Sequence, residues 1–180
     1  MRIISGKLSR FRFNPPKGFD SRPTTNFAKE GLFNILHHQF EIKGLKILDL
    51  YCGTGNITFE FASRDASVTA VDKNYKCTSF IKQTANKCKV EDQVTTIRSD
   101  VFKFLKENTT KFDVVFADPP FDFEKYEELV EAVATSKSLA GDNLFVLEHS
   151  KRVNLSHLDG FQESRKYGGV TFSFFKFNES

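Results

Sequence analysis

Four acidic residues stand at the ends of short apolar runs, where a carboxylate can contact a ligand. Asp49 lies near the end of the run KILDLY, and Asp118 directly follows FDVVFA. Two further acids, Asp72 and Asp100, follow the runs between them. Open α/β sheets bind ligands at the carboxyl ends of their strands, so acids placed in this way are expected to meet at one site. Because they follow four successive runs, the joint pattern is more specific than any one member.

A glycine-rich segment, Asp49-Leu-Tyr-Cys-Gly53-Thr-Gly55, follows the first of these runs. Glycine allows a sharp backbone turn and the close approach of a ligand. The dinucleotide fingerprint requires a third glycine where this chain has Thr58, so a pyrophosphate cradle is disfavoured. A carboxylate four residues before Gly53 suits a cationic ligand, and S-adenosylmethionine carries both an ammonium and a sulfonium group. A simple tight turn between strand and helix remains the alternative.

The next two acids each have a ligand-binding and a structural interpretation. Asp72 lies 17 residues after Gly55 and can accept hydrogen bonds from both hydroxyls of a ribose. Asp100 can accept a hydrogen bond from the amino group of an adenine. Each acid also precedes a helical pattern, so each is a candidate N-cap. Both alternatives stay open for both residues.

The segment Asp118-Pro119-Pro120-Phe121 predicts a binding site for an exocyclic amino group. Two prolines fix φ and remove two N–H donors, which leaves a rigid turn. The Asp118 carboxylate and the Pro119 carbonyl then offer acceptors alone, and these match the N–H donors of an amino group. Phe121 can stack on the ring that carries this group. Asp118, Pro119 and Phe121 are therefore the candidate catalytic residues.

The apolar periodicity predicts the elements that must position these residues. A helix is expected from Thr24 or Thr25 to about His38. Further helices are expected over Asn56–Ser63, Asn74–Cys88, Val101–Glu107 and Phe123–Lys137. Strands are expected over Lys46–Tyr51, Val68–Asp72, Val94–Ile97, Phe112–Ala117, Leu144–Glu148, Phe161–Lys166 and Val170–Phe177. Alternating strands and helices indicate a doubly wound, mostly parallel α/β sheet of about seven strands. The last two strands share a glycine turn, so the last strand is expected to be antiparallel.

Charge is concentrated at the start of the chain. The 180 residues carry a net charge of +3, but residues 1–40 alone carry +5, so the remainder carries −2. A basic head predicts contact with a polyanion. We expect residues 1–23 to form a small basic extension, with a hairpin that pairs RII with FRF, and residues 24–180 to form one domain. The candidate phosphate-binding residues are Lys7, Arg10, Arg12 and Arg22.

Several classes of protein are disfavoured. The opening residues lack the apolar region of a signal peptide, and no apolar run approaches the length of a membrane span. The three cysteines form no C-x-x-C pair, which fits a reducing cytosol and predicts no metal site. Cys52 has no histidine partner nearby in the sequence, so packing is favoured over a nucleophilic role. We expect a cytoplasmic protein without a membrane partner.

Taken together, the motifs resemble the S-adenosylmethionine-dependent, Rossmann-like methyltransferases that modify amino groups of nucleobases. The chain is most similar to the bacterial 16S rRNA guanine-N2 methyltransferases of the RsmD type. The resemblance extends nearly from end to end. It rests on the segments MRIISGKLSR, SRPTTNFAKEGLFNIL, DLYCGTG and DPPF and on the late Tyr167-Gly168.

The resemblance implies a role for each candidate residue. Asp49, Gly53 and Gly55 would line the methionine end of S-adenosylmethionine, with Asp72 on the ribose and Asp100 on the adenine. Tyr51 would also contact the cofactor. Residues 118–121 would hold the target guanine. The implied partner is 16S rRNA, within the small ribosomal subunit or an assembly intermediate, and we expect the enzyme to act as a monomer.

Other functions remain as alternatives. Adenine-N6 DNA methyltransferases and protein-glutamine methyltransferases use a related proline turn, but the small size and the basic head disfavour them. A non-catalytic RNA-binding or assembly factor could share the fold, although intact Asp72 and Asp118 argue against it. A NAD-dependent dehydrogenase is opposed by Thr58.

Overall fold

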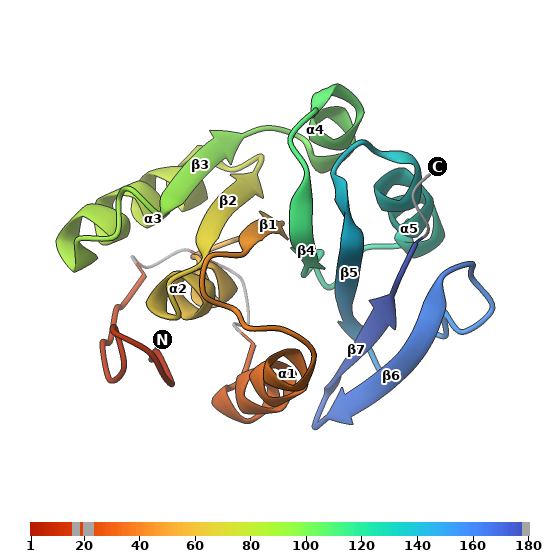
Figure 1. Ribbon diagram of the computed structural model, residues 1–180, viewed down its shortest axis with the longest axis horizontal. Helices are drawn as coiled ribbons and strands as arrows, with labels where there is room; N and C mark the ends of the chain where they lie inside the picture. The colour runs from red at the N-terminus through yellow and green to blue at the C-terminus, as the bar shows by residue number, and fades with distance from the viewer. Residues whose placement is uncertain (16–18, 20–23, 178–180) are drawn as a thin grey trace.

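A single sheet of seven strands forms the centre of the protein (Figure 1). The structure is a computed structural model and describes residues 1–15, 19 and 24–177. The strand order is β3-β2-β1-β4-β5-β7-β6. The strands are β1 (Lys46–Leu50), β2 (Ser67–Asp72), β3 (Val94–Arg98), β4 (Phe112–Ala117), β5 (Leu139–Ser150), β6 (Phe161–Tyr167) and β7 (Val170–Phe175).

Helices cover both faces of this sheet. The helices are α1 (Asn26–Gln39), α2 (Asn56–Ser63), α3 (Tyr75–Cys88), α4 (Val101–Glu107) and α5 (Tyr126–Thr135). Apolar residues of α1, α2 and α3 form one core cluster with one face of the sheet. Those of α4 and α5 form a second cluster with the opposite face. A sheet with helices on both faces buries its strands on two sides, which explains their nearly continuous apolar runs.

The predicted fold class is confirmed. Strands β1 to β5 pair in parallel, whereas β7 pairs antiparallel with both β5 and β6. The expected glycine turn joins β6 to β7, and Gly168 adopts a φ of 64° there. Thr25 caps α1 as predicted, because its side chain accepts a hydrogen bond from the Ala28 amide.

Two expected elements have bounds that differ from the structure by three residues or more. Helix α5 starts at Tyr126 rather than at Phe123, because Phe123 packs edge-on against Tyr51 and Tyr126 before the helix begins. Strand β5 is longer than the expected Leu144–Glu148. Its polar start still pairs with β4 at Phe112, and its end pairs with β7 at Val170. In both cases tertiary contacts override the local pattern.

The N-terminal segment packs on the main core. Arg2 and Arg12 form an isolated antiparallel bridge, and the Ile3 amide donates to the Phe11 carbonyl at 3.0 Å, so the segments RII and FRF lie paired. Ile3 and Phe13, on either side of the turn, are buried in the same cluster as α1 and α2. The turn also binds the end of α2, since the Lys7 amide donates to the Ser63 carbonyl at 2.8 Å. The segment thus contributes apolar surface to the core as well as basic side chains.

Among the described residues, no helix has the length and apolar character needed to cross a membrane. Within the same part of the chain, no cluster of three or more His, Cys, Asp or Glu side chains is arranged to hold a metal ion.

Candidate active site

Three acids at the ends of β1, β2 and β4 lie on one face of the sheet at its carboxyl edge: Asp49 and Asp72 within their strands and Asp118 directly after β4. Asp49 pairs in register with Ala70 on β2 and with Phe116 on β4. Asp72 and Asp118 each lie two residues beyond those partners, and side chains two residues apart point to the same face. This is the face covered by α1 and α2. The structure therefore brings the three acids together.

A tight turn connects β1 to α2. Gly53 and Gly55 have φ values of 52° and 80°, in the left-handed region that favours glycine. A Cβ atom on Gly55 would lie 2.9 Å from side-chain atoms of Ile81 and Phe59, so a larger residue does not fit there. At Gly53 the same added atom would meet nothing closer than 3.9 Å. The backbone at Gly53 is therefore open to a ligand.

Asp49 is buried behind this turn. Its side chain is 1% exposed and accepts a hydrogen bond from the Thr58 hydroxyl at 2.5 Å. Burial, together with the nearby charge of Asp72, raises the pKa of the Asp49 carboxyl to about 7, although the Thr58 bond opposes this shift. Thr58 stands where a dinucleotide-binding loop has its third glycine, and here it anchors the acid.

Asp72 joins the glycine turn to the end of β2. Its Oδ2 accepts a hydrogen bond from the Gly53 amide at 3.0 Å, and its Oδ1 accepts one from the Asn74 amide at 2.8 Å. The N-cap of α3 is Asn74, so the interpretation of Asp72 as that cap is wrong. A carboxylate has room for further donors, and Asp72 is only partly buried.

Asp100 does cap a helix. Its Oδ1 accepts a hydrogen bond from the Lys103 amide at 3.1 Å, at the start of α4. The capping alternative for Asp100 is therefore confirmed, and contact with an adenine stays a prediction. Asp100 lies near enough to Tyr51 to help raise the pKa of its phenol, along with burial and Asp72.

The proline turn after β4 sets Asp118 beside a row of aromatic rings. Tyr51 contacts Phe123, Phe123 contacts Tyr126, and Tyr126 contacts His149, each pair at an edge-on angle. Phe121 is 97% exposed and projects from the same turn. An exposed ring at this position is free to stack on a ligand.

Glu148 is a site residue that the sequence analysis missed. It lies on β5, next to β4, and is 6% exposed. Burial and the charge of Glu148 raise the pKa of Asp118 well above its usual range, with a smaller effect of Asp49. Burial likewise raises the pKa of Glu148 to about 7, against a hydrogen bond from Thr24. The one available signal was a single acid in the apolar run NLFVLEHS.

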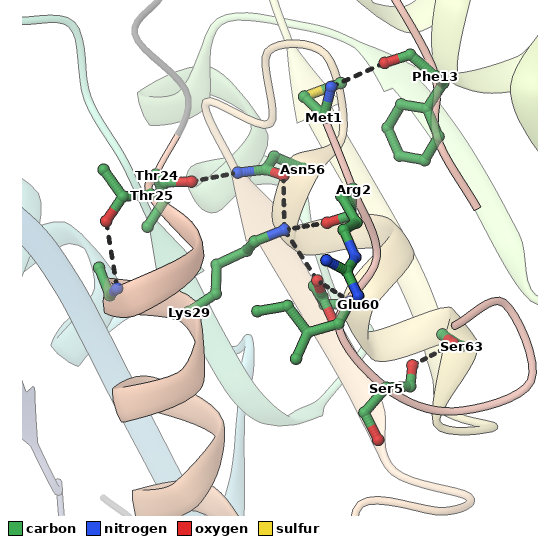
Figure 2. A network of polar contacts seen from close by, with 12 residues as sticks. Met1, Arg2, Ser5, Phe13, Thr24, Thr25, Lys29, Asn56, Glu60 and Ser63 are labelled. Carbon is green, nitrogen blue, oxygen red and sulfur yellow. Dashed lines mark hydrogen bonds and ion pairs between the residues drawn. The ribbon is translucent and has the colours of Figure 1, made fainter. Parts of the chain in front are cut away.

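A buried polar network continues from Thr24 into the core (Figure 2). The Thr24 carbonyl accepts a hydrogen bond from Asn56, and Asn56 accepts one from Lys29. The Lys29 ammonium also donates to the Arg2 carbonyl at 2.6 Å and to Glu60 at 2.8 Å. With three acceptors around it, this 1% exposed cation is satisfied. Lys29 therefore adds nothing to the basic surface, although it contributes to the charge of residues 1–40.

The candidate phosphate-binding residues lie apart from this network. Arg10 and Arg12 are exposed. Lys7 is also exposed but forms an ion pair with Asp65 at 2.8 Å and contacts Gln93. Arg22 lies outside the described residues. The segment reaches the glycine turn, because the Thr54 hydroxyl lies 3.0 Å from the sulfur of Met1.

Cys52 has no features of a nucleophile. Burial and the charges of Asp49 and Asp72 raise the pKa of its thiol well above the ordinary value, so it stays protonated. Its backbone instead closes the turn, accepting a hydrogen bond from the Gly55 amide at 2.8 Å. The arrangement as a whole brings several buried acids together, and hydrogen-bond donors or a positive charge on a ligand would stabilise their ionised form.

This chain is similar to known proteins in both sequence and fold. The family model described as "Conserved hypothetical protein 95" matches residues 1–176. A ribosomal RNA small subunit methyltransferase D of Haemophilus influenzae is 35% identical over 160 residues, which cover 84% of this chain and 79% of the relative. A hypothetical protein of Thermus thermophilus has a TM-score of 0.85 at 25% identity, covering 98% of this chain and 99% of its own.

A more distant solved structure shares the fold. It is a 16S rRNA N2 G1207 methyltransferase of Thermus thermophilus in complex with AdoMet and guanosine, with a TM-score of 0.74 at 19% identity. The likeness covers 99% of this chain and 49% of that one. The family match over nearly the whole chain and the identity to the Haemophilus influenzae relative show that this chain belongs to the Conserved hypothetical protein 95 family, the RsmD-type methyltransferases.

Proposed function

We propose that this chain transfers a methyl group from S-adenosylmethionine to the exocyclic N2 of a guanine in small-subunit (16S) ribosomal RNA. The observation that carries the proposal is the position of Asp118. It lies beside Asp49 at the carboxyl edge of the sheet, on a turn whose two prolines offer acceptors and no amide donors. The names of the relatives support rRNA as the substrate and N2 of guanine as the target atom.

The residues around the glycine turn fit S-adenosylmethionine. The open backbone at Gly53 gives room for close approach, and the Asp49 and Asp72 carboxylates complement a cationic ligand. We assign Asp49, Tyr51, Gly53 and Gly55 to the methionine end of the cofactor. Asp72 would accept the ribose hydroxyls, with Asp100 near the adenine.

The chemistry depends mainly on positioning. When bound, the cofactor supplies an electrophilic methyl group on a sulfonium, which is already a good leaving group. Guanine N2 is a poor nucleophile because its lone pair is delocalised into the ring. The Asp118 carboxylate and the Pro119 carbonyl would accept the N2–H bonds and favour a pyramidal nitrogen. As the N–CH3 bond forms and the CH3–S bond breaks, the proton that N2 gives up would pass to the Asp118 carboxylate or to water. Phe121 would stack on the base, which must be unstacked or in a loop to enter the site.

The basic residues would hold the RNA. Arg10, Arg12 and Arg22 would bind phosphates, and Lys7 would assist from the same segment. In this account residues 1–23 are the RNA-facing extension of a catalytic domain that comprises residues 24–180. We propose a cytoplasmic monomer that acts on 16S rRNA in the small subunit or in an assembly intermediate.

The modified nucleosides of rRNA test the proposal. In a strain that lacks this gene, we expect one N2-methylguanosine to disappear from 16S rRNA, and the gene supplied on a plasmid should restore it. Loss of an N6-methyladenine from DNA or of a methylglutamine from a protein would support one of the alternative methyltransferases. A complete set of modifications in the deletion strain would favour a non-catalytic assembly factor.

A further inference from the structure

Glu148, the acid beside Asp118, takes no part in the proposed methyl transfer. Resting on the proposed function, we propose that Glu148 reads the Watson–Crick edge of the target guanine by accepting its N1–H, while Asp118 accepts the neighbouring N2–H. Glu148 would then determine specificity for guanine over bases that lack a donor at N1.

Glu148 lies level with Asp118 on the adjacent strand. Ala117 of β4 pairs with Leu147 of β5, and Asp118 and Glu148 are the next residues of each. Residues level with each other on neighbouring strands point to the same face of a sheet. The influence of Glu148 on the pKa of Asp118 agrees with this proximity. The two carboxylates therefore form one acceptor surface.

Thr24 fixes the orientation of the Glu148 side chain. The Thr24 hydroxyl donates to Glu148 Oε2 at 2.8 Å, and both residues are buried. Asn56 holds the Thr24 carbonyl from α2, and Lys29 in turn holds Asn56. Among the described residues, no hydrogen bond to Glu148 Oε1 is present. One oxygen is thus anchored by the core and the other is available to a ligand.

The hydrogen-bonding pattern of guanine matches two adjacent acceptors. Its N1–H and N2 amino group are donors side by side, whereas adenine has an unprotonated N1 acceptor and no amino group at C2. A base with an acceptor at N1 would leave a buried carboxylate facing a lone pair. Sites built to hydrogen-bond a donor reject analogues that lack it by large factors, because the buried group is left unpaired.

Burial makes ionisation of the acids in this site unfavourable. Asp49, Asp118 and Glu148 are close acids with raised pKa values, and burial is the largest cause in each case. Tyr126, which contacts the same region, also has a phenol with a raised pKa. Hydrogen bonds to a carboxylate favour its charged form, so the N1–H and N2–H donors of a guanine would offset part of the cost of burying Asp118 and Glu148.

A base analogue tests the inference directly. The substrate is a synthetic RNA in which the target guanine, once mapped, is replaced by 2-aminopurine. This base keeps the N2 amino group but has an acceptor at N1. The enzymes are the wild type, Glu148→Gln, and Glu131→Gln as a matched control at an exposed position on α5. The measurement is the single-turnover methylation rate for each base, with the affinity for the cofactor measured separately.

The wild type and Glu131→Gln should prefer guanine over 2-aminopurine by roughly 10²-fold or more, in line with the rejection of analogues that lack a required donor. Glu148→Gln keeps an oxygen that can accept from Thr24, and its amide can donate to N1 of 2-aminopurine. We expect its guanine preference to fall at least about 10-fold, with cofactor affinity within a few-fold of wild type. Glu148→Asp should be slow but should retain the preference.

An unchanged base preference in Glu148→Gln would overturn the inference while leaving the proposed function intact. Failure of the wild type to methylate guanine in any RNA would instead overturn the proposed function, and the inference with it. If Glu148→Gln does not fold, loss of the guanine preference in Glu148→Asp would also contradict the inference.

Discussion

Thr24 donates a hydrogen bond to Glu148 across 124 residues of sequence. This contact joins Thr24, which directly precedes the N-cap of α1, to β5, the strand next to Asp118. Through Asn56 and Lys29 the same network reaches the backbone of Arg2. Hydrogen bonds through the core thus connect the candidate base site to the N-terminal segment. A substitution that breaks one of these bonds is expected to disturb both the base site and the N-terminal segment.

Asp72 is predicted to hold the ribose of the cofactor. Loss of hydrogen bonds to a charged acceptor costs about 1.5–3 kcal/mol, which corresponds to roughly 10- to 150-fold in affinity. We expect Asp72→Ala to weaken S-adenosylmethionine binding by that factor in calorimetry while the protein stays folded. Part of the loss will reflect the released Gly53 amide. Affinity near that of the wild type would limit Asp72 to a role in the turn.

Phe121 is predicted to stack on the target base. Its ring is 97% exposed, so truncation removes no packing from the core. Stacking is worth about 1–3 kcal/mol per base. We expect Phe121→Ala to raise the RNA concentration needed for half-maximal rate by roughly 5- to 150-fold, with an unchanged melting temperature. Phe27→Ala, at another exposed ring, is the matched control. Equal RNA requirements in Phe121→Ala and the wild type would contradict the stacking role.

Arg10, Arg12 and Arg22 are predicted to bind RNA phosphates. Each phosphate contact contributes roughly 0.7 units to the log–log slope of affinity against salt concentration for a single-stranded nucleic acid. Replacing the three arginines by Ala should weaken RNA binding and flatten that slope by up to about 2 units. Lys7→Ala should have a smaller effect, because Lys7 is already paired with Asp65. A salt slope that stays the same would mean that these charges serve only solubility.

The buried carboxyl of Asp49 predicts a pH-dependent stability. Its pKa is about 7 in the folded protein and near 3.8 when unfolded, so between these values the folded state holds a proton that the unfolded state has lost. The free energy of unfolding should therefore fall as the pH rises from about 4 to about 7, by at most roughly 4 kcal/mol from this group.

Asp49→Asn removes this titration while keeping an acceptor for Thr58. The free energy of unfolding, measured with urea, should fall less between pH 5 and pH 8 in this variant than in the wild type. The exposed Asp92→Asn is its control and should behave like the wild type. An equal pH dependence in Asp49→Asn and the wild type would show that the shift of the Asp49 pKa is absent.

The sequence predicted the fold well because its periodicities are local. Apolar runs bounded by glycine or acids identified the central strands β1, β2 and β4, and Asn56–Ser63 and Val101–Glu107 were predicted with the bounds of α2 and α4. Where the predicted bounds were wrong, tertiary contacts are the cause. Phe123 looked helical but packs against Tyr51, a contact with a residue distant in the sequence.

The candidate site was predictable only where acids follow strands. Glu148 was not identified as a site residue because it lies within an apolar strand. Its role depends on Asp118 of a neighbouring strand. Lys29 was counted as surface charge because nothing local reveals that Glu60 and Asn56 surround it. Buried polar partners that are distant in sequence leave no periodic signal.

The most direct test is single-turnover methyl transfer to RNA by Asp118→Ala, with the product nucleoside identified by mass spectrometry. Removal of a positioned polar group that acts on the reacting centre costs about 10²–10³ in rate. The account predicts that the wild type produces N2-methylguanosine and no other methylated nucleoside. It also predicts that Asp118→Ala loses at least about 10²-fold in rate while binding S-adenosylmethionine within a few-fold of wild type. Full turnover by Asp118→Ala, or N6-methyladenosine as the product, would contradict it.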